Sequence, residues 1–232
     1  MSGGRVQFVG CGPGAPDLLT VRAVRALGSA DIVIWNASML GREALEEHMR
    51  ADAEIVRWPP ATRVEILAAY DRAGAEDLLV VRLTGGDPTL FGVMEPELSA
   101  VRERGLACEI VPGVSAFTSA AAALVAEAGT RAAPLLLVDA VAIYEGDAPG
   151  DVPALAIYGP NRDPRALQRA LLERGLASST PCAVAIEVSR PDEALVACTL
   201  GELAETIEDL GLGVLTLVLA GAPALGLMRP PE

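Results

Sequence analysis

The stretch Arg5–Thr20 reads RVQFVGCGPGAPDLLT, and this segment decides the fold class. It opens with a short apolar run, continues through Gly10, Gly12 and Gly14, and passes into a helical pattern that ends near Gly28. This order predicts a buried strand, a loop and a helix. Because strand and helix patterns keep alternating through the first half of the chain, we expect an α/β fold built on a mostly parallel sheet.

Similar patterns continue to the end of the chain. Strands are expected in the first half at residues 31–35, 53–58, 77–83 and 107–111, and in the second half at 134–138, 154–158, 182–188 and 214–220. Helices of the second half are expected at residues 115–129, 164–174 and 200–210. We therefore predict two α/β domains, residues 1–114 and 115–232, with the ligand cleft between them.

The composition restricts the class of protein and its partners. The 232 residues are 51% hydrophobic and 3% aromatic, which predicts a globular chain with an aliphatic core. A net charge of -13 opposes the phosphate attraction on which nucleic-acid binding depends, so no nucleic-acid partner is expected. The chain shows neither a continuous apolar run of bilayer length nor a secretion signal at its start, which predicts a cytoplasmic protein without a membrane partner.

The sequence gives little support for a metal site or for a nucleophilic cysteine or histidine. The four cysteines are far apart, without a CxxC pair, and His48 is the single histidine, in a charged helical pattern. We therefore expect no metal site, and no catalytic residue is nominated. A dinucleotide fingerprint is not expected either, because Ala15 stands where it requires a glycine and Pro13 lacks an N–H for phosphate.

Three loops rich in glycine and proline each follow a predicted strand. They read GCGPGAPDLLT at residues 10–20, LTGGDPTLFG at 83–92 and VPGVSAF at 111–117. Loops at the carboxyl ends of parallel strands line the ligand crevice, so these three are expected to converge. Their glycines allow a flat ligand to approach the backbone, and Asp87 offers an acceptor. Each loop taken singly also fits an ordinary tight turn.

Taken together, the three loops resemble the tetrapyrrole methylase family. The family pattern GxGPGxxxLLT is matched at residues 10–20, its A-D-hydrophobic strand at 30–33, its GDPxxxG at 86–92 and its PGVSSF at 112–117. Ala116 replaces one serine of the last motif. The resemblance covers nearly the whole chain, and it is strongest to the precorrin-4 C(11)-methyltransferase branch, through PGVSAF followed by AAAAL and through PDEALVACTL.

The resemblance implies a homodimer of two-domain α/β subunits that binds S-adenosyl-methionine as methyl donor and methylates a tetrapyrrole of cobalamin or porphyrin biosynthesis. By matching motifs, it implies nine donor-binding residues: Pro13, Gly85, Gly86, Asp87, Leu90, Ser115, Ala116, Tyr158 and Val188. It implies no metal. A polycarboxylate substrate would further need local cations in this acidic chain, for which the candidates are Arg57, Arg63, Arg82, Arg131 and Arg190.

Two departures from the family pattern bear on the substrate. Asn36 stands where the siroheme branch has an aspartate proposed for acid/base chemistry, which argues against siroheme chemistry. The segment at residues 130–140 differs from the cobalamin branch, with Val138-Asp139 in place of Thr-Arg. A divergent methyltransferase acting on a non-corrinoid substrate therefore stays open, as does a non-catalytic protein that keeps the donor pocket.

Overall fold

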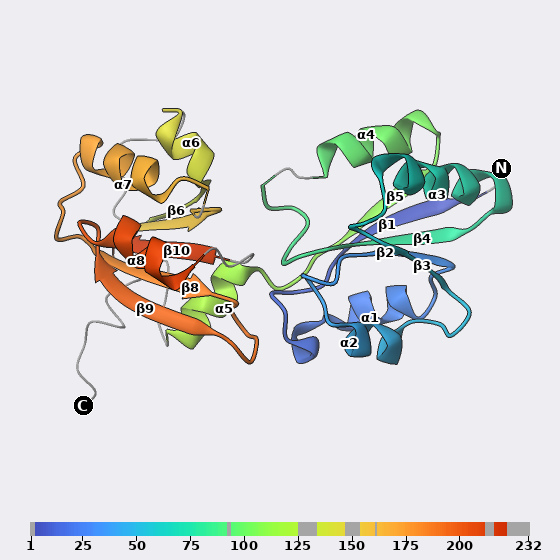
Figure 1. Ribbon diagram of the computed structural model, residues 1–232. Coiled ribbons are helices and arrows are strands. Elements are labelled where there is room, and N and C mark those ends of the chain that lie inside the picture. Colours follow the sequence, from blue (N-terminus) through green and yellow to red (C-terminus); the bar gives the residue numbers. More distant parts are fainter. Residues whose placement is uncertain are drawn as a thin grey trace. The chain divides into compact units, whose positions relative to one another are not determined.

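The computed structural model describes residues 3–91, 94–124, 134–146, 154–160, 162–211 and 216–221. The chain divides into two compact units, Met1–Ser115 and Ala116–Glu232. Each unit contains one five-stranded sheet with helices on its faces (Figure 1). The α/β fold class expected from the sequence is confirmed.

The sheet of the first unit is wholly parallel, with the strand order β3-β2-β4-β1-β5. Its strands are β1 Arg5–Gly10, β2 Ile32–Trp35, β3 Glu54–Arg57, β4 Leu79–Thr84 and β5 Ala107–Val111. Gly10 pairs with Thr84 and Val9 pairs with Val111. The carboxyl ends of β4, β1 and β5 therefore lie next to one another. This places the three glycine loops together at the carboxyl-terminal end of the strands of this sheet.

Helices cover both faces of the first sheet (Figure 1). They are α1 Val21–Leu27 and α2 Arg42–His48 on one face, and α3 Arg63–Glu76 and α4 Glu95–Glu103 on the other. Successive residues of β2 point to opposite faces: Ile32 and Ile34 belong to the core beside α3 and α4, Val33 and Trp35 to the core beside α1 and α2. Burial on both faces explains the uninterrupted apolar runs of β2 and the start of β4.

The first helix begins later than the sequence suggests. Residues Pro16–Leu18 form a single 3-10 turn, and α1 starts only at Val21. Thr20 determines this start, because its side-chain oxygen accepts a hydrogen bond of 3.1 Å from the backbone N–H of Ala23. Such a cap satisfies one of the otherwise unpaired N–H groups of the first turn.

The sheet of the second unit is mixed, with the order β6-β7-β10-β8-β9. Its strands are β6 Leu135–Asp139, β7 Ala154–Tyr158, β8 Pro181–Ile186, β9 Ala194–Thr199 and β10 Thr216–Gly221. β6 is parallel to β7, whereas β10 runs antiparallel to both β7 and β8. β7 and β8 consequently point the same way, and their carboxyl ends lie at the same edge.

Two cores cover the two faces of the second sheet. Its helices are α5 Ala116–Ala123, α6 Ala140–Tyr144, α7 Pro164–Glu173 and α8 Leu203–Leu210. Leu167 of α7 and Ile207 of α8 pack with Val184 of β8, while Ala120 of α5 packs with Ala183 and Ala185 of the same strand. Across the described residues of both units, no helix has the length and apolar character needed to span a membrane.

Two elements of the second unit were not expected from the sequence. β9 pairs with β8 as an antiparallel hairpin at the edge of the sheet, with Ala194 opposite Ile186. α6 follows β6 directly, because the Asp139 carboxylate accepts a hydrogen bond of 2.8 Å from the Val141 N–H and so caps a helix of five residues. In the altered segment, the described residues 134–139 thus end in a helix cap.

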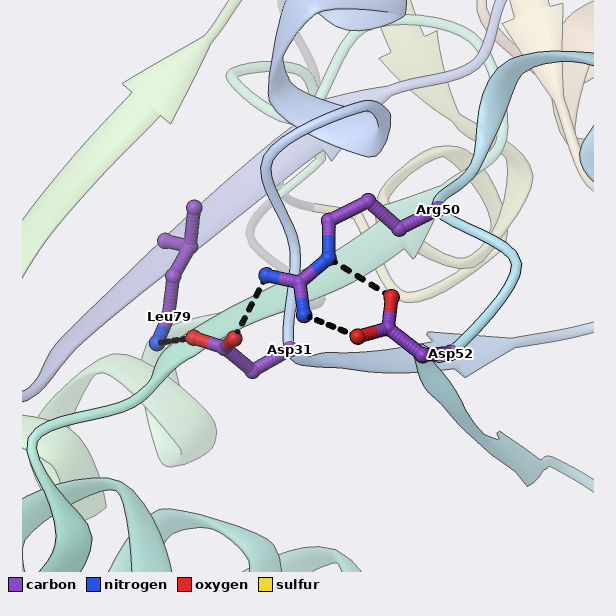
Figure 2. A network of polar contacts seen from close by, with 4 residues as sticks. All are labelled: Asp31, Arg50, Asp52 and Leu79. Carbon is purple, nitrogen blue, oxygen red and sulfur yellow. Dashed lines mark hydrogen bonds and ion pairs between the residues drawn. The ribbon is translucent and has the colours of Figure 1, made fainter.

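A polar network connects β2 and β4 at the amino-terminal end of the first sheet, which is opposite the glycine loops (Figure 2). The Asp31 carboxylate accepts a hydrogen bond of 2.8 Å from the Leu79 N–H at the start of β4 and pairs with Arg50 at 2.8 Å. Arg50 in turn donates to both carboxylate oxygens of Asp52, at 2.9 and 2.8 Å. The aspartate of the A-D-hydrophobic motif therefore joins β2 to β4 and lies away from the predicted donor site.

Candidate functional site

The first and second glycine loops pair through their backbones. The Cys11 N–H donates to the Thr84 carbonyl at 2.9 Å, which continues the β1–β4 ladder beyond the strands. Gly12 and Gly86 then exchange hydrogen bonds, with the Gly86 N–H donating to the Gly12 carbonyl at 2.8 Å and the Gly12 N–H to the Gly86 carbonyl at 3.3 Å. These contacts fix the two loops side by side.

The third loop joins them by close backbone packing. A Cβ atom at Gly10 would lie 2.6 Å from the Gly86 carbonyl oxygen and 2.7 Å from the Gly113 nitrogen. A Cβ at Gly113 would overlap the same Gly86 oxygen. Because these are backbone atoms held by hydrogen bonds, only glycine fits at the two positions. The structure thus brings the three loops together, as the sequence predicts.

The predicted donor-binding residues of the first unit lie on or beside this meeting point. Gly85, Gly86, Asp87 and Leu90 are all half-buried, whereas β4, the strand that leads into their loop, is mostly buried. Gly86 has a φ of +62°, a left-handed conformation that glycine adopts without strain. Backbone groups that reach the surface from a rigid base are suited to binding a flat ligand by its edges.

The Asp87 carboxylate makes its hydrogen bonds within the protein. One oxygen accepts from the Thr89 N–H at 2.8 Å and from the Thr89 hydroxyl at 2.6 Å. The other oxygen accepts from the Gly113 N–H at 3.2 Å. Thr89 and Gly113 were not among the predicted site residues. The D-x-T spacing is the only sequence signal for the first contact, and nothing local indicates the second.

The predicted residues of the second unit gather around the start of α5. Tyr158 ends β7, and its hydroxyl oxygen accepts a hydrogen bond of 3.1 Å from the Phe117 N–H in the first turn of α5. Val188 follows β8 and is buried in the core that Phe117 and Tyr158 also contact. Ala116 is the first residue of α5, and the buried Ser115 precedes it. The chain reaches this group directly from the third glycine loop.

Val188 lies in a loop with an unusual backbone. Glu187 and Ser189, on either side of it, have φ angles of +46° and +67°, which residues with a Cβ rarely adopt. The ion pair of Arg190 with Glu187 at 3.2 Å and the hydrogen bond from the Ser189 N–H to Glu193 at 2.6 Å hold this conformation. Strain of this kind persists where the surrounding structure enforces it.

The candidate cations are mostly engaged within the protein. Arg82 makes a bidentate contact with Glu97, at 2.9 and 3.0 Å, and Arg190 pairs with Glu187. Arg57 lies over the Trp35 ring, 5.9 Å from its centre. Arg63 is exposed at the start of α3, and Arg131 lies outside the described residues.

The buried Tyr70 and the half-buried Glu97 form a hydrogen-bonded pair beside Arg82 that stabilises the fold. The Tyr70 hydroxyl donates to Glu97 at 2.6 Å, which links α3 to α4. Burial raises the pKa of Tyr70, and the neighbouring Glu97 carboxylate raises it further. Burial alone would raise the pKa of Glu97, but the hydrogen bonds and charge of Arg82 outweigh it and lower that pKa. The network joins β4, α3 and α4.

Three of the four cysteines have raised pKa values, and the described residues show no cluster of metal ligands. Burial raises the pKa of Cys182 to about 12 and also raises the pKa values of Cys108 and Cys198, so these thiols stay protonated at neutral pH. Within the described ranges, no three His, Cys, Asp or Glu side chains are grouped as metal ligands. The arrangement is suited to binding and orienting reactants through its backbone.

Comparisons with known proteins agree with this geometry. A cobalt-precorrin-4 C(11)-methyltransferase of Methanocaldococcus jannaschii is 29% identical over 229 residues, which cover 94% of this chain and 87% of that protein. A uroporphyrinogen-III C-methyltransferase of Paracoccus denitrificans is 29% identical over 231 residues, covering 94% of this chain and 80% of that protein.

A solved structure shares the fold over nearly the same length. The uroporphyrin-III C-methyl transferase from Thermus thermophilus, complexed with S-adenyl homocysteine, superposes with a TM-score of 0.74 at 27% identity and covers 94% of this chain and 98% of its own. The family model "Tetrapyrrole (Corrin/Porphyrin) Methylases" matches residues 5–204. With its three convergent glycine loops and a match over most of its length, the chain is a methyltransferase that belongs to the tetrapyrrole methylase family.

Proposed function

We propose that this chain transfers the methyl group of S-adenosyl-methionine to C11 of precorrin-4, a step of cobalamin biosynthesis. The observation that carries the methyl-transfer part is the convergence of the three glycine loops at Gly10, Gly86 and Gly113. Family membership supports the tetrapyrrole class of substrate. A relative of known structure that binds the demethylated donor supports the choice of donor.

The residues proposed for donor binding fall into two groups, one in each unit. Those of the first unit are Pro13, Gly85, Gly86, Asp87, Leu90 and Ser115, and those of the second are Ala116, Tyr158 and Val188. The loops of the first unit offer partly exposed backbone. In the second unit, the half-buried Phe117 and Tyr158 offer apolar surface for the donor's ring or its methionine chain, and the buried Val188 packs in the same core.

For methyl transfer, the main role of these residues is to align the donor methyl group with the acceptor carbon. A sulfonium methyl is a good electrophile, and an electron-rich pyrrolic carbon attacks it, so that the S–CH₃ bond breaks as the C–C bond forms. Holding two reactants in line can supply about 7 to 11 kcal/mol of the barrier. The residues of the loops therefore bind, orient and exclude water, and no side chain is assigned a proton-transfer role.

Asn36 supports precorrin-4 over uroporphyrinogen III as the substrate. Its side-chain oxygen accepts hydrogen bonds from the Ser38 N–H at 2.9 Å and from the Ser38 hydroxyl at 2.7 Å. An amide does not titrate near neutral pH, so Asn36 cannot take the acid/base role proposed for the aspartate that the siroheme branch has at this position. The PGVSAF and PDEALVACTL segments favour the same branch.

The test is a mass measurement on two substrates in parallel. The purified protein is incubated with S-adenosyl-methionine and enzymatically generated precorrin-4, and separately with uroporphyrinogen III. We expect a product one methyl group heavier from precorrin-4 and none from uroporphyrinogen III. A known enzyme for each step serves as the positive control.

Other outcomes reassign the substrate. Methylation of uroporphyrinogen III alone would overturn the precorrin-4 assignment and keep the family. If the protein binds S-adenosyl-homocysteine but methylates neither tetrapyrrole, the divergent methyltransferase with a non-corrinoid substrate replaces the proposal. If it binds neither donor nor product, as measured by calorimetry at millimolar ligand, the donor site itself is refuted.

A further inference from the structure

The side chain of Asp87 bridges two of the glycine loops. Two of its three hydrogen bonds go to Thr89 in its own loop, at 2.8 and 2.6 Å, and the third goes to the Gly113 N–H of the third loop, at 3.2 Å. A carboxylate accepts about four hydrogen bonds. Most of this capacity is therefore used inside the protein before any ligand is present.

The bridge ends at the point where the three loops are in contact. Gly113 packs against Gly10 and against the Gly86 carbonyl so closely that neither Gly10 nor Gly113 has room for a Cβ. Only one residue separates Gly113 from Ser115, a predicted donor-binding residue. A bond that fixes the Gly113 N–H therefore fixes where the third loop leaves the sheet.

We propose that Asp87 is a positioning residue, whose carboxylate holds the second and third loops together so that their backbones, and not the carboxylate itself, bind the methyl donor. This inference deepens the proposed function and rests on it for the identity of the ligand. It changes the expected role of Asp87, which the family resemblance would place in direct contact with the donor.

The chemistry of the bridge distinguishes aspartate from asparagine. Asp87→Asn keeps the size of the side chain but leaves one oxygen to serve two loops, and turns its NH₂ group toward an N–H that needs an acceptor. Thr89→Val removes only the hydroxyl donor, and Thr89→Ser keeps it. The Thr89 hydroxyl donates to the Asp87 carboxylate. Removing this hydroxyl should therefore change donor affinity only if the position of the Asp87 carboxylate controls that affinity.

The experiment measures the bridge and the ligand separately. Hydrogen exchange of the Gly113 amide, followed by NMR on the ligand-free protein, reports the bridge, because a hydrogen-bonded amide exchanges only when the bond opens. Calorimetry with S-adenosyl-homocysteine reports donor-site affinity. Asp52→Asn is the matched control, since Asp52 is exposed at the opposite edge of the same sheet and pairs with Arg50.

We expect Asp87→Asn to accelerate Gly113 exchange and to weaken S-adenosyl-homocysteine binding by about ten-fold, which corresponds to about 1.4 kcal/mol. Thr89→Val should weaken binding by a smaller factor, while Thr89→Ser and Asp52→Asn should bind as the unmodified protein does.

Two different results would overturn the inference. The first concerns the role of Asp87 alone, and the second concerns the donor site as a whole. Unchanged Gly113 exchange in Asp87→Asn, with weakened ligand binding and no effect of Thr89→Val, would show a direct contact between Asp87 and the ligand. Absence of S-adenosyl-homocysteine binding in the unmodified protein would refute the proposed donor site and the role of the bridge in it, even where Gly113 exchange responds to Asp87→Asn.

Discussion

Asp31 joins three strands through its side chain and its backbone. Its carboxylate accepts from the Leu79 N–H, its N–H donates to the Leu79 carbonyl at 2.9 Å, and its carbonyl accepts from the Glu54 N–H at 2.9 Å. β2, β3 and β4 thereby begin in register at the amino-terminal end of the sheet, opposite the glycine loops. An aspartate in a family motif can thus serve the fold that supports the site.

Replacing Asp31 should cost stability without touching the donor site. Asp31→Ala leaves the buried Leu79 N–H without its side-chain acceptor and Arg50 with only Asp52, so we expect the free energy of unfolding to fall by about 1 to 3 kcal/mol. Urea unfolding followed by circular dichroism measures this. Asp52→Ala, which removes an exposed partner of Arg50, is the control and should cost less. Equal losses in the two variants would contradict the assignment.

At the scale of the elements, the three loops depend on close backbone contact. Gly10→Ala places a methyl group 2.6 Å from the Gly86 oxygen and 2.7 Å from the Gly113 nitrogen, where no flexible side chain can move away. We expect a loss of about 1 to 3 kcal/mol of stability and a strong loss of S-adenosyl-homocysteine binding.

Gly85→Ala provides the comparison for this prediction. The nearest atoms to its Cβ belong to the Met39 side chain, starting at 3.4 Å, which is ordinary contact. Its unfolding midpoint in urea should stay close to that of the unmodified protein. A Gly10→Ala variant as stable as Gly85→Ala would show that the loops can separate without cost.

The Arg82–Glu97–Tyr70 network gives the first unit a defined response to acid. Because the pKa of Glu97 is lowered in the folded protein, its ionisation stabilises the fold above the ordinary value of 4.5, and this contribution is lost as the pH falls through the folded value. Glu97→Gln should lower stability at pH 7 by about 2 kcal/mol, since the charge-assisted contacts of Arg82 are lost.

The pH dependence separates this effect from simple loss of packing. The difference in unfolding free energy between the unmodified protein and Glu97→Gln should shrink below pH 4.5, because the unfolded state takes up the Glu97 proton first and the folded state follows at lower pH. Urea titrations at several pH values measure it. A difference that stays constant down to pH 3 would exclude the ionised Glu97 as the source.

The sequence predicted the helices and strands more reliably than the contacts between residues that are far apart in the chain. Parallel strands with apolar residues on both faces, such as β2 and β4, were recognisable from their uninterrupted runs. β9 was missed because its residues follow a segment typical of a loop, and its pairing with β8 depends on the sheet. The contact of Asp87 with Gly113 spans 26 positions, a separation that no local pattern encodes.

At the scale of the whole molecule, the resemblance to the family predicts a homodimer. An aliphatic chain of this kind, with 51% hydrophobic residues, gains by covering apolar surface in an assembly. Light scattering at tens of micromolar should therefore give a particle of twice 24.0 kDa. A particle of 24.0 kDa over that concentration range would contradict the expectation.

The charge of the chain sets a further condition on its substrate. A protein with a net charge of -13 repels a polycarboxylate at long range, so binding requires cations close to the site. Contacts of this kind are screened when salt shortens the Debye length to about 10 Å at 0.1 M and about 3 Å at 1 M. The KM for the tetrapyrrole should therefore rise with sodium chloride while kcat changes little, because the charges act in binding.

S-adenosyl-homocysteine carries no net charge at neutral pH, so its dissociation constant should stay nearly constant and serves as the internal control. A KM that falls with salt would mean that long-range repulsion outweighs local attraction, and that apolar contacts hold the ring.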